Sequence, residues 1–169
     1  VFDELSPETD EISGIGRDRV HLRWASAAEG QQFADYVTQV TEVISGLGAF
    51  DKQQYELQLA SLARALVSPR LRWLVGIDRH VTEFENVYHE KTDPDHFKKV
   101  LENAVAAEYH KALIQELLNQ APMTVREMAR KTGLPVHTIS IRLNDLERSG
   151  LADLGKYEGT TPKFVALAA

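Results

Sequence analysis

Polar side chains suited to molecular recognition are concentrated between residues 136 and 148. Apolar residues fill the intervening positions at the spacing of one helix face, so we expect the polar side chains on the opposite, outward face. Their hydroxyl, imidazole, amide and guanidinium groups supply hydrogen-bond donors and acceptors for contact with a partner. Together with one aliphatic residue, the outward set is His137, Thr138, Ser140, Ile141, Arg142, Asn144 and Arg148.

Sequence patterns typical of catalysis or metal binding do not occur. There is no GxSxG elbow or comparable nucleophile setting, so we nominate no catalytic residue. The GIG and GLG triplets lack the third glycine or the Lys-Ser/Thr pair with which glycine-rich loops hold phosphate. The six histidines lack the i, i+4 or HExxH spacing of a helical metal site, so we expect surface or core histidines and no metal ligands. Those nearest to a cluster are His80 with Glu83, and His89 with Glu90 and His96.

Length and composition limit the class of protein. With 169 residues, 43% of them apolar, the chain can bury one good core, or a small domain and a second packed unit. No apolar run approaches the roughly 20 residues that span a bilayer, and the acidic start is no secretion signal, so we expect a cytoplasmic protein without membrane contact. The lack of cysteine excludes disulfides, thiol nucleophiles and iron–sulfur ligands from this chain. A start at Val1 instead of Met indicates processing or, as we favour, a piece of a longer chain.

The net charge of −6 is unevenly distributed. Residues 1–108 carry 19 acidic and 11 basic side chains, whereas residues 109–169 carry 6 acidic and 8 basic ones. Only the C-terminal third can therefore attract phosphate. Its small positive surplus is modest for a nucleic-acid binder, because nonspecific affinity grows with the number of phosphates that are neutralised.

The N-terminal third predicts one strand and one helix. Arg19 to Trp24 alternates polar and apolar residues, which is typical of a half-buried strand. Ser26-Ala-Ala-Glu29 is a capping box, and the apolar spacing after it predicts a helix that stops at the GLG triplet. Both tryptophans, Trp24 and Trp73, are expected in a core or at a subunit contact, with the core favoured.

Three helical segments are expected in the middle of the chain. The first begins near Asp51 and ends at Ser68-Pro69. The next forms either short helices or one helix kinked at Gly76. Asp93-Pro94 combines an N-cap acid with proline at the first helical position, so it starts a long helix. The apolar face of that helix suits an internal core or a dimer seam equally well.

The last sixty or so residues predict a helix, a second helix, a turn, a third helix and a β-hairpin. Thr124-Val-Arg-Glu127 is a capping box that opens a short helix ending at Gly133. The third helix stops at Gly150, and two short strands follow about a turn centred on Gly159. This order resembles the winged-helix fold of many transcription regulators. We therefore expect a mainly α protein with small β content: a short strand and helices, then a C-terminal winged helix-turn-helix with a β-hairpin wing.

The winged-helix resemblance implies contact with double-stranded DNA through the outward side chains of residues 136–148. In such folds this helix enters the major groove and the wing can reach phosphate. Ile141, Asp145 and Glu147 argue against DNA, since phosphates repel carboxylates and base edges favour hydrogen-bond donors. The surface therefore leaves open a second use, the docking of another protein. Base reading is expected of His137, Ser140, Asn144 and Arg148, and contact from the wing is expected of Lys156 and Lys163.

A second resemblance covers the stretch IGRDRVHLRWASAAEGQQF, residues 15–33. It resembles the C-terminal end of the iron–sulfur delta subunit of methyl-viologen-reducing hydrogenase, in which a strand ending in Trp precedes a Ser-Ala-Ala-Glu-Gly helix start. The later segments RLRWLVG and NVYHEK look like extended members of that family, in which a helical segment and a winged helix follow. The family motif falls on Trp24, Ser26, Ala27, Ala28, Glu29 and Gly30.

The hydrogenase resemblance implies electron transfer between a hydrogenase or related dehydrogenase and a heterodisulfide reductase. Such subunits hold a [2Fe–2S] cluster with cysteines, which here would lie upstream of residue 1, so the chain itself would hold no cofactor. It would be a non-catalytic part of an oxidoreductase complex, and its winged helix would dock a neighbouring subunit. This is our first hypothesis; the alternative is a DNA-binding transcription regulator that dimerises through its long helices. We expect a strand-helix segment in residues 1–50, a helical middle in 51–108 and the winged helix in 109–169.

Overall fold

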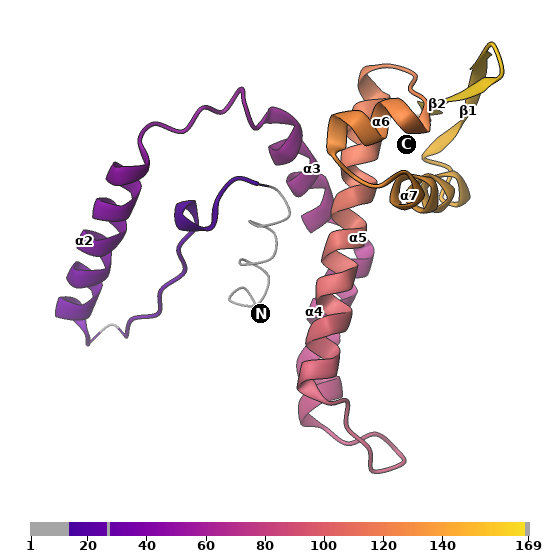
Figure 1. Ribbon diagram of the computed structural model, residues 1–169. Helices are drawn as coiled ribbons and strands as arrows, with labels where there is room; N and C mark the ends of the chain where they lie inside the picture. The colour runs from indigo at the N-terminus through magenta and orange to yellow at the C-terminus, as the bar shows by residue number, and fades with distance from the viewer. Residues whose placement is uncertain (1–13, 27, 168–169) are drawn as a thin grey trace. The chain divides into compact units, whose positions relative to one another are not determined.

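The computed structural model describes residues 14–26 and 28–167 (Figure 1). The described chain forms helices and a two-stranded antiparallel sheet, and divides after Glu56 into two compact units. The predicted class, mainly α with a small β component and a C-terminal winged helix, is confirmed. None of the helices in the described part combines the length and the apolar character needed to cross a membrane.

The first unit contains the 3-10 helix η1 (Arg17–Arg19) and helix α2 (Gly30–Leu47). The strand predicted from Arg19 to Trp24 does not form, so that prediction was wrong. An isolated strand leaves its backbone groups unpaired, and no strand of the described chain pairs with this segment. Trp24 is 72% exposed, so the alternating pattern buries no face and the expected core position was also wrong.

Helix α2 begins three residues later than the capping box predicts, with Glu29 and not Ser26 at the N-cap. Glu29 Oε2 does accept a hydrogen bond from the Ser26 N–H at 2.8 Å, and the Glu29 N–H donates to the Ser26 carbonyl, but these bonds close a turn before the helix. Ala27 of the predicted box lies outside the described residues. The helix ends at Gly48, whose φ of 71° favours glycine. Apart from its start, the helix matches the prediction.

The second unit begins with helices α3 (Glu56–Leu66) and α4 (Pro69–Glu83) and the long helix α5 (Pro94–Gln120). Ser68 Oγ accepts from the Leu71 N–H, and Asp93 accepts from the His96 N–H, so each cap stands before a proline at the first helical position. Helices α4 and α5 lie side by side as a hairpin (Figure 1). Helix α4 runs through Gly76 without a break, and Trp73 on it is 62% exposed, contrary to the expected core position.

The C-terminal end of α5 becomes the first helix of a winged helix. Helices α6 (Val125–Thr132) and α7 (Val136–Arg148) and strands β1 (Ala152–Glu158) and β2 (Thr161–Ala166) follow (Figure 1). A short bridge pairs Met123 with Phe164, which ties the segment before α6 to the wing. The fully buried side chains of this core include Ile114, Leu117, Met128, Ile139, Leu143 and Leu146.

Candidate nucleic-acid interface

The caps of α6 and the turn after it fix the position of α7. Thr124 Oγ1 accepts from the Glu127 N–H at 3.2 Å, and Glu127 Oε2 accepts from the Thr124 N–H at 2.8 Å, which completes the predicted capping box. Gly133 ends α6 with a φ of 73°, in the left-handed region. Three residues later α7 begins. Its inner face, which includes Ile139 and Leu143, packs into the core, and each of these two residues is at most 2% exposed. The outer face of α7 is thereby held toward solvent.

Most of the predicted contact residues of α7 share that outer face. They lie on the side of the helix opposite its buried residues Ile139, Leu143 and Leu146. Thr138 is half-buried beside this face, and Ile141 is 50% exposed within it. The exposed set is His137, Ser140, Ile141, Asn144 and Arg148, which supplies imidazole, hydroxyl, amide and guanidinium groups around one aliphatic side chain.

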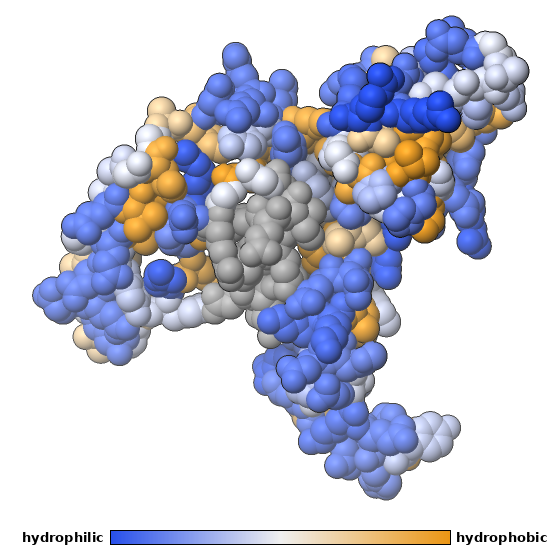
Figure 2. All heavy atoms as spheres, in the orientation of Figure 1, coloured by the Kyte–Doolittle hydropathy of each residue, from blue (hydrophilic) through white to orange (hydrophobic). Residues whose placement is uncertain are grey.

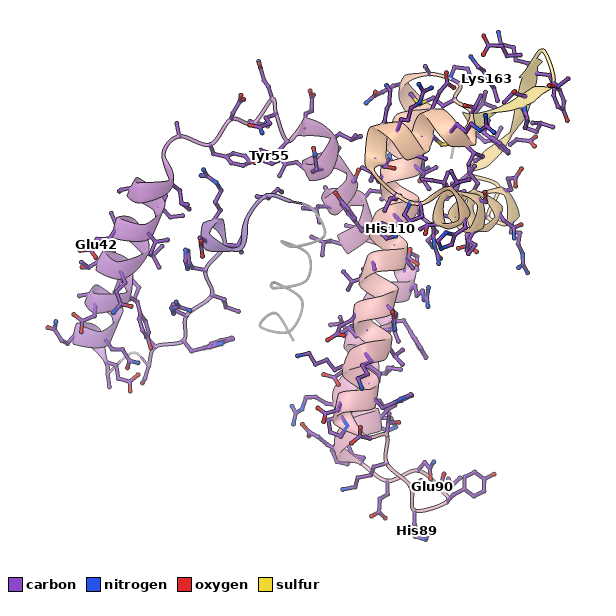
Figure 3. All side chains as sticks on the ribbon, viewed as in Figure 1. Glu42, Tyr55, His89, Glu90, His110 and Lys163 are labelled. Carbon is purple, nitrogen blue, oxygen red and sulfur yellow. The ribbon has the colours of Figure 1, made fainter. Side chains whose placement is uncertain are left out.

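Arg142 is placed differently from the other predicted contact residues. Its side chain is 23% exposed, its Nη1 donates to Asp145 Oδ2 at 2.7 Å, and its Nε is buried without a hydrogen-bond partner. The positive charge of Arg142 also interacts electrostatically with His110 on α5, which is labelled in Figure 3. Burial, and secondarily this charge, lowers the pKa of His110 below its ordinary 6.5. Arg142 therefore belongs to the contact between α5 and α7 more than to the outer face.

The two wing lysines also differ. Lys156 on β1 is exposed, whereas Lys163 on β2, labelled in Figure 3, is 19% exposed at its side chain and lies 2.6 Å from Glu158 Oε2. This hydrogen bond raises the pKa of Lys163, so the lysine stays charged but is held across the hairpin. The ladder shifts register between Leu154 and Lys156, a bulge that includes Gly155. Lys156 is the wing cation that is free to reach outward.

Three cations on α6 were missed by the sequence analysis. Arg126, Arg130 and Lys131 are exposed, and none forms an ion pair with a described residue. Figure 2 shows strongly hydrophilic side chains over α6 at the upper right. Their i, i+4, i+5 spacing, which places neighbouring charges on one side of a helix, was a signal that could have found them.

Internal pairing removes most of the acidic character that argues against DNA. Glu127 is engaged in the capping box, where the hydrogen bonds from Thr124 lower its pKa, and Asp145 is paired with Arg142. Of the three carboxylates in residues 125–148, Glu147 is the one without a partner among the described residues. Against it stand four exposed, unpaired cations on the two helices: Arg126, Arg130, Lys131 and Arg148.

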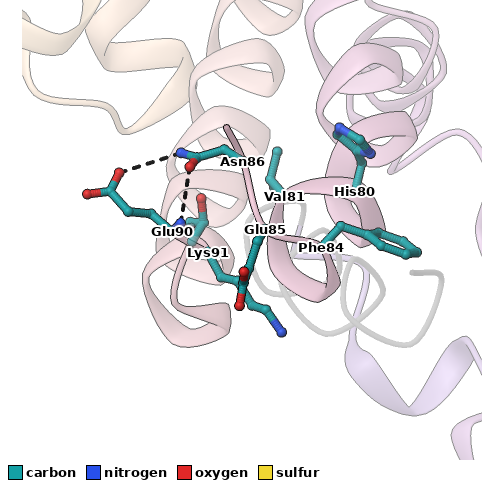
Figure 4. Close-up of a pocket in the computed structure, with 8 residues that line it drawn as sticks. His80, Val81, Phe84, Glu85, Asn86, Glu90 and Lys91 are labelled. Atoms are coloured by element: carbon teal, nitrogen blue, oxygen red, sulfur yellow. Dashed lines mark hydrogen bonds between the residues drawn. The ribbon is translucent and has the colours of Figure 1, made fainter. Parts of the chain in front are cut away.

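The histidines that come nearest to a cluster in the sequence are His80 on α4, His89 in the α4–α5 loop and His96 on α5. His89 lies at the end of the hairpin far from α7 (Figure 3). A cavity of about 190 Å³ beside this loop is lined in part by His80 and Glu85. Figure 4 shows these lining residues. His89 Nδ1 lies 3.3 Å from Glu85 Oε2, and the Glu90 carboxylate accepts from the Asn86 amide, so these groups bond to each other within the loop. The described residues contain no group of three or more side chains suited to a metal ion.

Comparison with known protein families agrees with this geometry. Residues 107–152 match the winged helix-turn-helix DNA-binding family. The match covers the end of α5, both helices of the motif and the start of β1. No solved structure matches the chain.

The predicted relation to hydrogenase delta subunits was wrong. No match to that family is found, and the matched family is one of DNA-binding domains. The predictions that depended on this relation were therefore wrong as well: the electron-transfer role, the reductase partners and the subunit-docking use of the winged helix. The motif Trp24 to Gly30 misled because a strand-like alternation followed by a capping box is short and local, and in the structure its first half is an exposed loop.

Proposed function

We propose that this protein binds double-stranded DNA through α7 and the wing, and acts as a transcription regulator. The observation that carries the proposal is the exposed polar face of α7 within a segment that matches winged helix-turn-helix DNA-binding domains. A helix of this width fits the major groove, where donors and acceptors on the base edges distinguish sequences.

Each exposed side chain on α7 has a chemical counterpart on a base edge. The Asn144 amide can bond to both N6 and N7 of adenine, and the Arg148 guanidinium can bond to O6 and N7 of guanine. Ile141, the aliphatic residue on this polar surface, can contact the methyl group of thymine. The exposed aliphatic residue is therefore compatible with base reading rather than opposed to it.

Phosphate contact is assigned to the cations around that face. Arg126, Arg130 and Lys131 on α6 occupy the helix that crosses the DNA backbone in helix-turn-helix complexes. Lys156 on the wing has no partner among the described residues and can contact the neighbouring phosphates. These contacts position α7 without reading sequence.

The test is selection of a preferred duplex from a random pool by the full chain, followed by affinity measurements on the enriched and a scrambled duplex. We expect the enriched duplex to bind at least about 10³-fold more tightly. Asn144→Ala should cost about 1–3 kcal/mol on the enriched duplex and leave binding to the scrambled one unchanged. Asn103→Ala, on the exposed surface of α5 outside the winged helix, is the matched control and should bind both duplexes as the unchanged protein does. Failure to enrich any sequence, or equal discrimination by the Asn144→Ala variant, would contradict the proposal.

A further inference from the structure

A cavity of about 490 Å³ lies between the α3–α4 junction, the middle of α5 and the end of α7. All of its lining residues belong to the second compact unit. Its volume falls within the range of roughly 300–1,000 Å³ that is typical of small-molecule sites. The elements that form it can be followed in Figure 1. It is distinct from the outer face of α7, which is assigned to DNA above.

The walls of this cavity are mostly apolar. Ala65 and Ala112 are almost fully buried, and Val67 at the α3–α4 junction is 66% exposed, so the cavity reaches solvent on that side. An apolar body of modest size would be desolvated here, which favours binding in proportion to the apolar area that leaves water. The apolar lining residues are Ala65, Val67, Pro69, Ala112, Leu146 and Leu151.

Gln115 is a polar side chain in this apolar wall that has no partner. It is 6% exposed, it lines the cavity, and its amide makes no hydrogen bond to any described residue. The amide atoms are not among the fully buried side-chain atoms without a partner, so they keep access to the cavity. A ligand atom in the cavity could pair with the Gln115 amide, whose carboxamide both donates and accepts.

The charges around the cavity leave one positive charge in excess. Glu108, whose side chain is 8% exposed, lies 2.7 Å from Lys111 Nζ and 3.7 Å from Arg70 Nη1. One carboxylate therefore faces two cations. The third lining cation, Arg64, is already paired with Glu116 at 2.6 Å. The excess favours a ligand with a single negative charge near Arg70 and Lys111.

We propose that this cavity binds a small amphipathic organic acid. Its apolar body packs against the wall and its one carboxylate faces Arg70 and Lys111, with Gln115 as a hydrogen-bonding partner. Leu146 and Ser149 of the lining belong to the end of α7 and its cap, so the bound acid contacts the helix assigned to base reading. The regulatory part of the proposal, that the acid changes DNA affinity, rests on the proposed function; binding of the acid does not.

Calorimetric titration of the full chain tests binding of the acid directly. The probes are 3-phenylpropionate and octanoate, each compared with its uncharged amide. We expect at least one acid to bind saturably with one site per chain. Its uncharged amide should bind about tenfold more weakly, or more weakly still. Arg70→Gln and Gln115→Leu should each lower the affinity for the acid about tenfold. Arg72→Gln, an exposed cation on α4 outside the cavity, is the matched control and should bind unchanged.

Three results would overturn acid binding: no heat of binding for either acid at millimolar concentration, equal affinity for acid and amide, or unchanged affinity in both cavity variants. Far-UV circular dichroism confirms that each variant is folded. Duplex affinity is then measured with and without the saturating acid, and a change of about threefold or more is expected. An acid that binds without changing DNA affinity would overturn the regulatory part. A chain that binds acid but no DNA would contradict the proposed function alone, and one that binds DNA but no acid would contradict this inference alone.

Discussion

Arg142 and Arg148 lie on the same helix and carry the same charge, but their surroundings differ. Arg142 is paired with Asp145 and partly buried, whereas Arg148 is exposed and has no ion pair among the described residues. From sequence, both replacements are expected to weaken DNA binding. From structure, we predict that Arg148→Ala weakens binding to the enriched duplex by about 1–3 kcal/mol, because this guanidinium is assigned to a guanine base edge. Arg142→Ala should instead lower the free energy of unfolding by about 1 kcal/mol, measured in urea, because it leaves Asp145 unpaired. Equal effects of both replacements on binding to the enriched duplex would contradict this distinction.

His110 predicts a pH dependence of stability at the residue scale. Its pKa in the folded chain lies below the ordinary 6.5, first because of burial and second because of Arg142. Above pH 6.5 the imidazole is neutral in both states and costs nothing. As pH falls through 6.5, the unfolded chain takes up a proton before the folded chain does, so stability falls until the lower folded pKa is reached. The melting temperature of the unchanged protein should therefore drop more between pH 7 and about pH 5.5 than that of His110→Gln. The same drop in both proteins would show that His110 does not contribute.

At the scale of the element, two glycines predict opposite effects of one substitution. Gly76 lies inside α4 with no atom within 4 Å of an added Cβ, whereas Gly133 ends α6 with a φ of 73°. Gly76→Ala should stabilise the protein by about 0.5–1 kcal/mol, since alanine favours the helix interior. Gly133→Ala should destabilise it by about 1–2 kcal/mol, since the left-handed region strains a side chain. Chemical unfolding of both variants checks the pair, and effects of the same sign would contradict the backbone assignment.

Local signals predicted the second unit well. The proline at the start of α5, the capping box of α6 and the left-handed Gly133 each act within a few residues, so sequence suffices to find them. The strand predicted at Arg19 failed because a strand depends on a partner elsewhere in the chain. The pairing of Arg142 with Asp145 was also missed, although its i, i+3 spacing was visible. Such ion pairs decide which charged side chains of a helix stay available to a partner. A count of charged residues does not reveal these pairs.

For the whole molecule, the position of the core predicts that the second unit folds alone. The core cluster and the residues packed against it all lie between residues 57 and 169. A fragment of residues 51–169 should therefore unfold cooperatively, with a melting temperature within a few degrees of that of the winged helix in the full chain. It should also keep the duplex affinity of the full chain, because every residue assigned to DNA lies within it. A fragment that shows no cooperative transition would contradict this division.

Charge provides the most direct test of DNA binding by the whole molecule. The full chain carries a net charge of −6, so only a localised set of cations can account for attraction to DNA. The measurement is fluorescence anisotropy of a labelled duplex at several salt concentrations, with the unchanged protein and the triple variant Arg126→Gln, Arg130→Gln and Lys131→Gln. The control variant also removes three positive charges, but from the hairpin of α4 and α5. It carries Arg72→Gln, Lys98→Gln and Lys99→Gln. We predict that the α6 variant loses affinity and that its salt slope falls by about 2–3, since each phosphate contact contributes about 0.9, while the control keeps the slope of the unchanged protein. Equal slopes for both triple variants, or no duplex binding by the unchanged protein at low salt, would contradict the account.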